Sequence, residues 1–353
     1  MLTGRGLPNL QRGGDAWQAL RVPPRNLDRE SLASEDRDSF AKLTYSEHPA
    51  TPVRLPSAVA ASRQLLVTPL LQLDLHGFAY RRPRRPIADA IGYSTARPSK
   101  GISHDVAWIH TRKADRGYFH FLADHLQALE QGVRAFGDEL PVLVLPEVRP
   151  GYRAWGDYFF RHFDVEFTWF RPDRPSRLTE VLALPSPAAS GHFDPELAAS
   201  IRRRVAGDSI DRGNRRLFVL RTRNRRVRNL DEILPILRHF GVEIVDFDEM
   251  EPLAQVEVCA STSLLVGPHG AGLANQWWMP KGSTVLELIR PSPWNNTCFW
   301  RLACALGHDY VAVSTQRAAT TGNPEAVSHL RNGDLIVPPV HLETELREVL
   351  EAQ

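Results

Sequence analysis

The chain has few cysteines and no long apolar run. Its 353 residues include only Cys259, Cys298 and Cys304, which show no Cys-x-x-Cys spacing. An odd, scattered set predicts neither a disulfide framework nor a zinc site. No stretch approaches the ~18 apolar residues of a membrane span, and no apolar segment follows the first charges. We therefore expect a cytoplasmic protein without a transmembrane segment.

Excess charge is also lacking, because the formal net charge is only +2. The interleaving of aromatic and basic residues typical of RNA-binding modules is missing too, which disfavours a nucleic-acid partner. The basic residues are nevertheless uneven, since eleven arginines fall between Arg202 and Arg228 against Asp208 and Asp211 alone. Such a run is usually a solvated face. A subset could still clamp a diphosphate, because guanidinium groups bind phosphate oxygens in bidentate fashion.

Composition suggests where the domains begin and end. The first 61 residues are rich in Pro, Arg, Asp and Ser, which predicts an extended or partly disordered leader. Residues 171–195 again hold several prolines with Ser and Gly, which is typical of an interdomain linker. We expect a leader at residues 1–61, an N-terminal α/β domain at 62–180 and a linker at 181–195. A C-terminal α/β domain is expected at 196–335 and a final helix at 336–353.

A basic cluster runs from Arg81 to Pro86. An exposed loop is the favoured interpretation, and peripheral contact with the inner face of an anionic membrane is left open.

Short apolar runs alternate with segments of helical periodicity, which predicts parallel sheets covered by helices. Strands are expected at 64–75, 106–110, 141–145, 165–170, 217–220, 242–246, 264–266, 284–289 and 310–313. Helices are expected at 118–132, 152–163, 196–205, 230–240, 253–260, 273–279, 299–306 and 342–350.

The most informative stretch runs from Ser263 to Ile289. A buried strand ends at Gly267 and is followed by the turn Gly270-Ala271-Gly272 and a short helical segment. Such a turn presents backbone N–H groups and the positive end of a helix dipole to an anion, and glycine allows close approach. A phosphate group is the anion expected to bind at this turn. The alternative is a tight turn that binds nothing.

Polar residues around this turn extend the candidate site. His269 lies at the carboxyl end of the strand, where open α/β sheets bind ligands, and can donate to a diphosphate. Asn275 could face the same site one turn later. Glu287 could accept hydrogen bonds from a ribose diol, or be a buried acid paired with an arginine. Arg221 and Arg226 follow the strand at 217–220, which places them at the same edge of the sheet.

A second candidate site lies in the first half of the chain. His120 and Asp124 are four residues apart on a predicted helix and therefore neighbours on one side of it. A carboxylate can orient an imidazole, or serve as a base itself. From spacing alone, a plain hydrogen bond on a surface helix is the favoured interpretation. Asp246-Phe247-Asp248 is a weaker candidate for a metal site, and metal binding there is not favoured.

The glycine-rich stretch resembles the signature of the family 61 glycosyltransferases, which include bacterial capsular-polysaccharide enzymes and eukaryotic xylosyl- and O-linked N-acetylglucosaminyltransferases. The resemblance rests on Gly267-Pro268-His269-Gly270-Ala271-Gly272-Leu273-Ala274-Asn275, then Met279-Pro280, Gly282, Val285 and Glu287, and upstream Arg221, Arg226, Asn229, Glu232 and Gln255. A weaker match covers Tyr118 to Asp124. There the chain departs from the family pattern, with Gly117 where asparagine is common and Gln127-Ala128 where Pro-Arg often occurs.

This resemblance implies a GT-B-like fold of two facing Rossmann-like domains with parallel sheets. It also implies an inverting glycosyltransferase that moves a sugar from a nucleoside-diphosphate sugar to an acceptor hydroxyl, in bacterial surface polysaccharide or glycan synthesis. Asp124 is the preferred general base and His120 the competing candidate. The implied nucleotide-sugar site consists of Arg221, Arg226, Gly267, His269, Gly270, Ala271, Gly272, Asn275 and Glu287.

No metal or further cofactor is expected, because arginines and a helix end can neutralise the diphosphate. A nucleotide-dependent oxidoreductase is disfavoured, because the chain lacks Gly-x-Gly-x-x-Gly after its first strand. A protein that binds a nucleotide sugar or an anionic polymer without catalysis is the remaining alternative.

Overall fold

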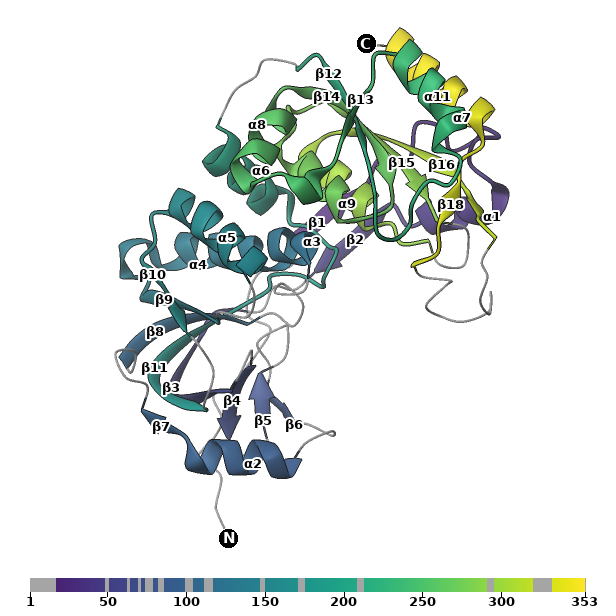
Figure 1. The fold of residues 1–353 in the computed structure, drawn as a ribbon. Helices are drawn as coiled ribbons and strands as arrows, with labels where there is room; N and C mark the ends of the chain where they lie inside the picture. The colour runs from purple at the N-terminus through teal and green to yellow at the C-terminus, as the bar shows by residue number, and fades with distance from the viewer. Residues whose placement is uncertain are drawn as a thin grey trace. The chain divides into compact units, whose positions relative to one another are not determined.

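The chain folds into two compact units (Figure 1). Unit 1 comprises Met1–Gln18 and Ser46–Arg204, and unit 2 comprises Ala19–Tyr45 and Val205–Gln353. The computed structural model describes residues 17–47, 51–61, 64–68, 71–73, 79–81, 86–98, 104–110, 117–146, 150–170, 175–207, 213–290, 295–319 and 332–352. Both units combine helices with sheets that contain parallel strands, which confirms the predicted α/β class.

Unit 1 is built on a mixed sheet, in which nine strands are described. Its order is β10-β9-β8-β11-β3-β4-β5-β6, with β7 beside β11. The first four strands are parallel, and the rest of the path from β11 to β6 is antiparallel. These strands are β3 (Val53–Ala61), β4 (Gln64–Thr68), β5 (Leu71–Leu73), β6 (Ala79–Arg81), β7 (Arg97–Pro98), β8 (His104–His110), β9 (Val142–Pro146), β10 (Phe167–Phe170) and β11 (Ser176–Pro185).

One long helical segment of unit 1 carries the predicted His120 and Asp124 pair. It starts as α3 (Tyr118–His120), widens into a π-helical stretch (η3, Phe121–Leu126) and continues as α4 (Gln127–Phe136), which contacts β11. The other helices of this unit are α2 (Pro86–Thr95), α5 (Pro150–Phe159) and α6 (Pro195–Ala206).

Unit 2 contains a parallel sheet whose described strands run in the order β13-β12-β14-β15-β16. Helices α7 and α11 share one apolar core with one face of this sheet, while η7 packs against β14, α8 and α9. The strands are β12 (Arg215–Val219), β13 (Glu243–Val245), β14 (Thr262–Pro268), β15 (Thr284–Ile289) and β16 (Asp309–Ser314). The helices are α7 (Leu230–His239), α8 (Pro252–Ala260), η7 (Ala271–Trp278), α9 (Cys298–Leu306) and α11 (Pro339–Glu351).

Two predicted segments differ from the structure. Residues 181–195 were expected to be a linker, but β11 occupies 176–185 and lies inside the sheet between β8 and β3. Its side chains from Val181 to Leu184 are buried, and the prolines of this region flank the strand or end it. The boundary between the units instead falls after Arg204.

The expected leader is also folded where it is described. Residues 53–61 form β3 of unit 1, and residues 19–45 belong to unit 2, where they run along the edge strand β16. The buried Asn26 side chain donates to the Ala312 carbonyl at 2.7 Å and accepts from the Ala312 amide at 3.1 Å. Ser31 donates to Glu345 of α11 at 2.5 Å, and its carbonyl accepts from the Ser314 amide. These side-chain bonds order a segment whose composition alone resembles disorder.

None of the helices in the described part of the chain has the length and apolar content needed to cross a membrane. The basic cluster predicted at Arg81 to Pro86 falls largely outside the described residues, since 82–85 are not among them.

Replacing Asn26 with Ala should lower the free energy of unfolding of unit 2 by about 1–3 kcal/mol. Both backbone groups of Ala312 would lose their partner, and a buried unpaired group costs about that much. Urea unfolding followed by tryptophan fluorescence measures the change. The control is Arg25→Ala, which removes an exposed ion pair with Asp309 and should change stability by about 0–1 kcal/mol. Equal effects of the two substitutions would contradict the role given to Asn26.

Candidate functional site

The strand order of unit 2 defines where a ligand should bind. From β12 the chain passes through α7 to β13 on one side, and then returns through α8 to β14 on the other side of β12. Open α/β sheets bind ligands at the carboxyl ends of the strands where this reversal occurs. Arg221 lies two residues beyond β12, and His269 immediately follows β14. The topology therefore brings these two predicted residues to the same edge of the sheet.

Arg221 packs directly on the glycine turn. A Cβ atom placed on Gly270 would lie 2.1 Å from Nη1 of Arg221, so only glycine allows the guanidinium to come this close to the backbone. The guanidinium is held by Asn224, whose carbonyl and Oδ1 accept from Nε at 2.9 Å and Nη2 at 2.6 Å. Burial lowers the pKa of Arg221, and the charges of Asp248 and Asp246 oppose this change. The side chain is therefore a fixed, partly desolvated cation.

Arg225 is a second cation at this edge, and its position could not be predicted from the sequence pattern. Its backbone adopts a left-handed φ of 53°, and its Nη1 donates to the His269 carbonyl at 2.9 Å. Burial, together with the positive charges of Arg221 and Arg290, lowers the pKa of Arg225 to about 10. Its buried Nε has no hydrogen-bond partner among the described residues. A buried donor without an acceptor, close to like charges, indicates a site for an anion.

Arg226, which was predicted to bind the diphosphate, is exposed and paired instead. Asp334 accepts from its Nε at 3.0 Å, its Nη2 at 2.8 Å and its backbone amide at 3.0 Å. The same carboxylate lies 3.6 Å from Nη1 of Arg228. The pKa of Arg226 is raised by its hydrogen bond to Asp334. The sequence could not separate Arg226 from its neighbour Arg225, because only the backbone turn decides which of the two points inward.

Glu287 is buried inside unit 2 and does not face an open site. Its Oε1 forms a short hydrogen bond with Nδ1 of His269, and its Oε2 accepts from the Tyr310 hydroxyl at 2.6 Å. Both carboxylate oxygens are therefore engaged, and the side chain has no exposed surface. The expected contact with a ribose diol is incompatible with this arrangement. The alternative, a buried acid, holds with a histidine and a tyrosine as partners in place of an arginine.

The glycine motif contains residues with packing roles as well. A Cβ atom on Gly267 would lie 2.9 Å from Cβ of Val219, and one on Gly272 would lie 2.6 Å from Cγ1 of the same valine. These two glycines therefore let η7 and β14 close on β12. Asn275 is fully buried and donates to Gln255 at 2.9 Å, so it ties η7 to α8 rather than facing a ligand. Ala271 begins η7, a 3₁₀ helix that lies where a short helical segment was expected.

The candidate base in unit 1 is a cluster of three side chains. Nδ1 of His120 lies 3.2 Å from Oδ2 of Asp124 and 3.1 Å from Oγ of Ser190. Ser190 also donates to the same Oδ2 at 3.1 Å. The Asp124 side chain is only 4% exposed, whereas that of His120 is 28% exposed. The structure thus brings the predicted pair together and adds Ser190, which lies too far along the chain for spacing to reveal.

The π-helical stretch and one glutamine position this cluster. Asp124 lies within η3, and π-helical turns inside α-helices are frequent at functional sites. Gln127 donates to the His192 carbonyl at 3.2 Å and accepts from the Asp194 amide at 3.0 Å. It therefore ties the segment that carries Ser190 to the helix that carries Asp124.

The Asp-x-Asp sequence serves as a helix cap. Oδ1 of Asp246 accepts from the Asp248 amide at 3.0 Å, and Phe247 between them is buried. Among the described residues, no three His, Cys, Asp or Glu side chains are grouped as a metal site.

The burial of His269 predicts a pH effect on stability. Burial lowers the pKa of His269 below its ordinary value, and Glu287 opposes the change. On acidification the unfolded chain therefore takes up this proton before the folded chain does, so the contribution is present above the unfolded pKa of about 6.5 and is lost below it. The melting temperature of unit 2 should fall as pH decreases from 7.5 to 5.5.

His269→Asn is the variant that tests this cause. Its amide N–H can replace Nδ1–H as donor to Glu287 but cannot titrate. Melting curves of the variant should show a weaker dependence on pH than those of the wild type. An unchanged slope would show that His269 does not carry the effect.

Part of the chain is similar in sequence to known glycosyltransferases. Residues 118–286 match the family described as Glycosyltransferase 61. A segment of 84 residues is 33% identical to the alpha-1,3-arabinosyltransferase XAT3 of Oryza sativa subsp. japonica, and it covers 23% of this chain and 14% of that protein. A solved structure of the dodecameric iron-containing heptosyltransferase TibC with ADP-D-beta-D-heptose aligns over 98% of both chains, with a TM-score of 0.37 and 9% identity.

The matched residues include both clusters described above, His120 with Asp124 and Arg221 with Arg225 and His269. The resemblance inferred from the sequence is thereby confirmed. The similarity to glycosyltransferase family 61 covers residues 118–286, a little under half of the chain.

Proposed function

We propose that the protein is an inverting glycosyltransferase that transfers a sugar from a nucleoside-diphosphate sugar to an acceptor hydroxyl. The observation that carries this proposal is the pair of half-buried cations, Arg221 and Arg225, at the ligand-binding edge of the parallel sheet in unit 2. The proposal includes the GT-B arrangement, a cytoplasmic location that leaves open peripheral contact with the inner membrane face, and a glycan acceptor such as a bacterial surface polysaccharide.

The two arginines would stabilise the leaving group. When the bond between the anomeric carbon and the phosphate oxygen breaks, its electron pair goes to the nucleoside diphosphate. Fixed guanidinium donors are worth most for such developing charge where water is excluded. Arg225 has a buried N–H ready to donate, and Arg221 is held in place by Asn224. The proposed reaction needs no metal ion for this step.

His120 is better placed than Asp124 to deprotonate the acceptor. The sequence favoured Asp124, but its carboxylate is almost wholly buried and accepts from Ser190. A carboxylate that receives Nδ1–H leaves the lone pair of the imidazole on Nε2. His120 is partly exposed and could take the hydroxyl proton on that nitrogen. We assign Asp124 the role of orienting His120.

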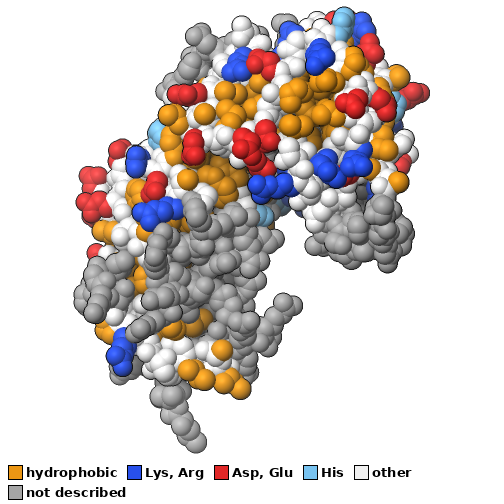
Figure 2. Space-filling view, in the orientation of Figure 1, with side chains coloured by type: hydrophobic (Ala, Val, Ile, Leu, Met, Phe, Trp, Pro, Cys, Tyr) orange, Lys and Arg blue, Asp and Glu red, His pale blue; other side chains and the backbone are white. Residues whose placement is uncertain are grey.

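A non-catalytic protein that binds a nucleotide sugar or an anionic polymer is the second candidate. A polymer would require a continuous basic surface. On the face shown in Figure 2, acidic and basic side chains of unit 2 are interspersed, so that face offers no basic track. Binding without turnover is distinguished from catalysis by the His120 variants described below.

Replacing Arg225 with Ala should weaken binding of a nucleoside diphosphate by about 1.5–3 kcal/mol, since a charge-assisted hydrogen bond is lost. Calorimetric titration with UDP, CDP, GDP and dTDP, in EDTA and in magnesium, measures the affinity. Arg226→Ala is the matched control and should stay within about 1 kcal/mol, because that side chain is exposed and already paired. The assignment is wrong if Arg226→Ala loses affinity and Arg225→Ala does not.

Replacing His120 with Asn should reduce turnover by about 10²–10⁴, the usual contribution of a positioned base, with nucleotide affinity unchanged within a few fold. Asn keeps a donor toward Asp124 but has no nitrogen at the Nε2 position. Release of nucleoside diphosphate from a panel of sugar nucleotides measures turnover. Asp124→Asn should have a smaller effect. Full activity of the His120 variant together with an inactive Asp124 variant would restore Asp124 as the base.

A further inference from the structure

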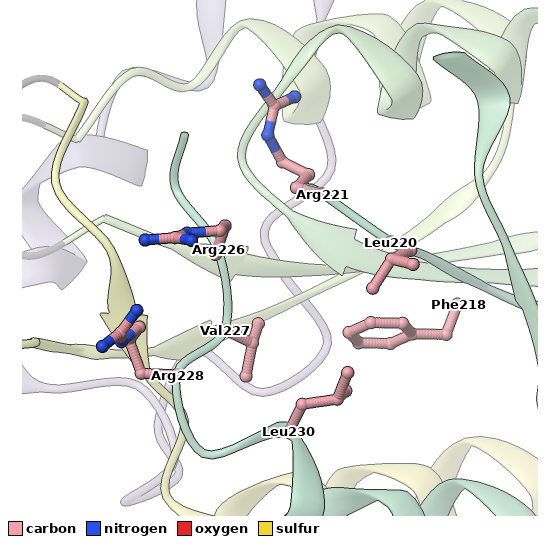
Figure 3. A pocket seen from close by; sticks show the side chains of 7 residues that line it. All are labelled: Phe218, Leu220, Arg221, Arg226, Val227, Arg228 and Leu230. Carbon is pink, nitrogen blue, oxygen red and sulfur yellow. The ribbon is translucent and has the colours of Figure 1, made fainter. Parts of the chain in front are cut away.

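Helix α2 (Pro86–Thr95) of unit 1 is a feature that the proposed chemistry does not use. The pocket of about 300 Å³ in unit 2, by contrast, is lined by Arg221 and Arg226 and so belongs to the sheet edge described above (Figure 3). The outer side of α2 combines exposed apolar side chains with positive charge at both ends of the helix. That combination indicates an interaction surface.

The inner side of α2 is packed against the sheet of unit 1. The Tyr93 hydroxyl donates to the Val67 carbonyl of β4 at 3.4 Å. The Tyr93 carbonyl accepts from Arg177 of β11 at 2.9 Å, and that guanidinium lies 4.8 Å from the centre of the Tyr93 ring. A Cβ atom on Gly92 would lie 3.4 Å from Cγ of Pro175, so Gly92 also faces the body of the unit. These contacts determine which side of the helix points outward.

The outer side of α2 is apolar. Ile87 is 76% exposed and Ile91 is 58% exposed, and residues four apart lie on the same side of an α-helix. Ala88, Ser94 and Thr95 are exposed as well, so the described side chains on this side carry no charge. Figure 2 shows hydrophobic atoms gathered over α2. Burial of two isoleucines against an apolar partner would release favourable free energy that the isolated chain does not gain.

The sequence on both sides of α2 is strongly basic. Residues 80–100 contain six Arg and Lys against Asp89 alone, which gives this stretch a net charge of +5 in a chain whose total is +2. Arg85 is joined directly to Pro86, the first residue of α2, and the exposed Arg97 follows its last residue by two positions. The connectivity of the chain therefore brings positive charge to both ends of the helix.

We propose that the outer side of α2 docks unit 1 on an anionic lipid membrane. Ile87 and Ile91 enter the boundary between head groups and acyl chains, while the flanking arginines attract the lipid phosphates. Helices of this kind bind membranes through the sum of the two contributions. An acidic protein fits less well, because two isoleucines on one helix offer far less area than the ~800 Å² per partner of a stable protein interface.

Co-sedimentation of the full chain with lipid vesicles tests this docking surface. The vesicles contain phosphatidylcholine alone, or phosphatidylcholine with roughly one third phosphatidylglycerol to supply negative charge. The wild type should bind the anionic vesicles and not the neutral ones, with an affinity that falls as salt is added. Neither nucleotide nor turnover enters the measurement, so its result is independent of the proposed function.

The variant Ile87→Gln/Ile91→Gln isolates the apolar contribution. It keeps the charge of the chain and uses a good helix former, and it should bind anionic vesicles at least about tenfold more weakly than the wild type. The matched control is Leu253→Gln/Val340→Gln, which removes two exposed apolar side chains from helices α8 and α11 of unit 2 and should bind within about twofold of the wild type. Ile91→Ala only shortens one exposed side chain, and it should weaken binding about threefold.

Three results would overturn the proposal. In the first, the wild type does not bind anionic vesicles at low salt. In the second, Ile87→Gln/Ile91→Gln and Ile91→Ala bind as tightly as the control, which assigns the adsorption to the arginines without α2. In the third, sedimentation velocity shows a wild-type dimer that Ile87→Gln/Ile91→Gln converts to a monomer while vesicle binding is unchanged, which makes this side of α2 a contact between copies of the chain.

Discussion

The arrangement of unit 2 depends on one buried carboxylate. Glu287 has no contact with solvent, and a buried charge is costly unless it is paired and hydrogen-bonded. His269 supplies one of those bonds from the end of β14, and Tyr310 supplies the other from β16. The Glu287 carboxylate on β15 therefore links the three adjacent strands β14, β15 and β16. The carbonyl of the same His269 accepts from Arg225. His269, which stabilises the buried Glu287 carboxylate, therefore also positions the Arg225 guanidinium at the ligand-binding edge.

That cation also depends on a distant segment of the chain. The Arg225 amide donates to the Asn332 carbonyl, and Leu335 pairs its backbone with residues 226 and 228. Asp334 then fastens Arg226 on the solvent side. Together these contacts hold the loop in a turn where Arg225 has a left-handed φ, a conformation that a non-glycine residue adopts only when its surroundings require it. The two neighbouring arginines therefore differ, because Arg225 is half-buried while Arg226 is exposed and paired with Asp334.

The sequence predicted the features that depend on residues close together in the chain. Apolar runs located most strands of both sheets, and the four-residue spacing located the His120 and Asp124 pair. Contacts between distant residues escaped prediction. The prolines beside β11 made its sequence resemble a linker. The segment at 19–45 is ordered by hydrogen bonds to Ala312 and Glu345. Ser190, the inward turn of Arg225 and the buried state of Glu287 likewise follow only from the assembled fold, because each depends on a partner far along the chain.

The electrostatics of the two arginines differ in a way that bears on binding. The cation of Arg221 is supported by Asp248 and Asp246, which offset part of its burial. Arg225 is close to Arg221 and Arg290, and Glu287, the carboxylate whose charge acts on it, already has two partners. The positive charge of Arg225 is therefore less compensated than that of Arg221. An anion that accepts from its Nε would fill an empty hydrogen bond and reduce the repulsion among the arginines at the same time, so affinity should concentrate at Arg225 rather than spread over the many exposed arginines around it.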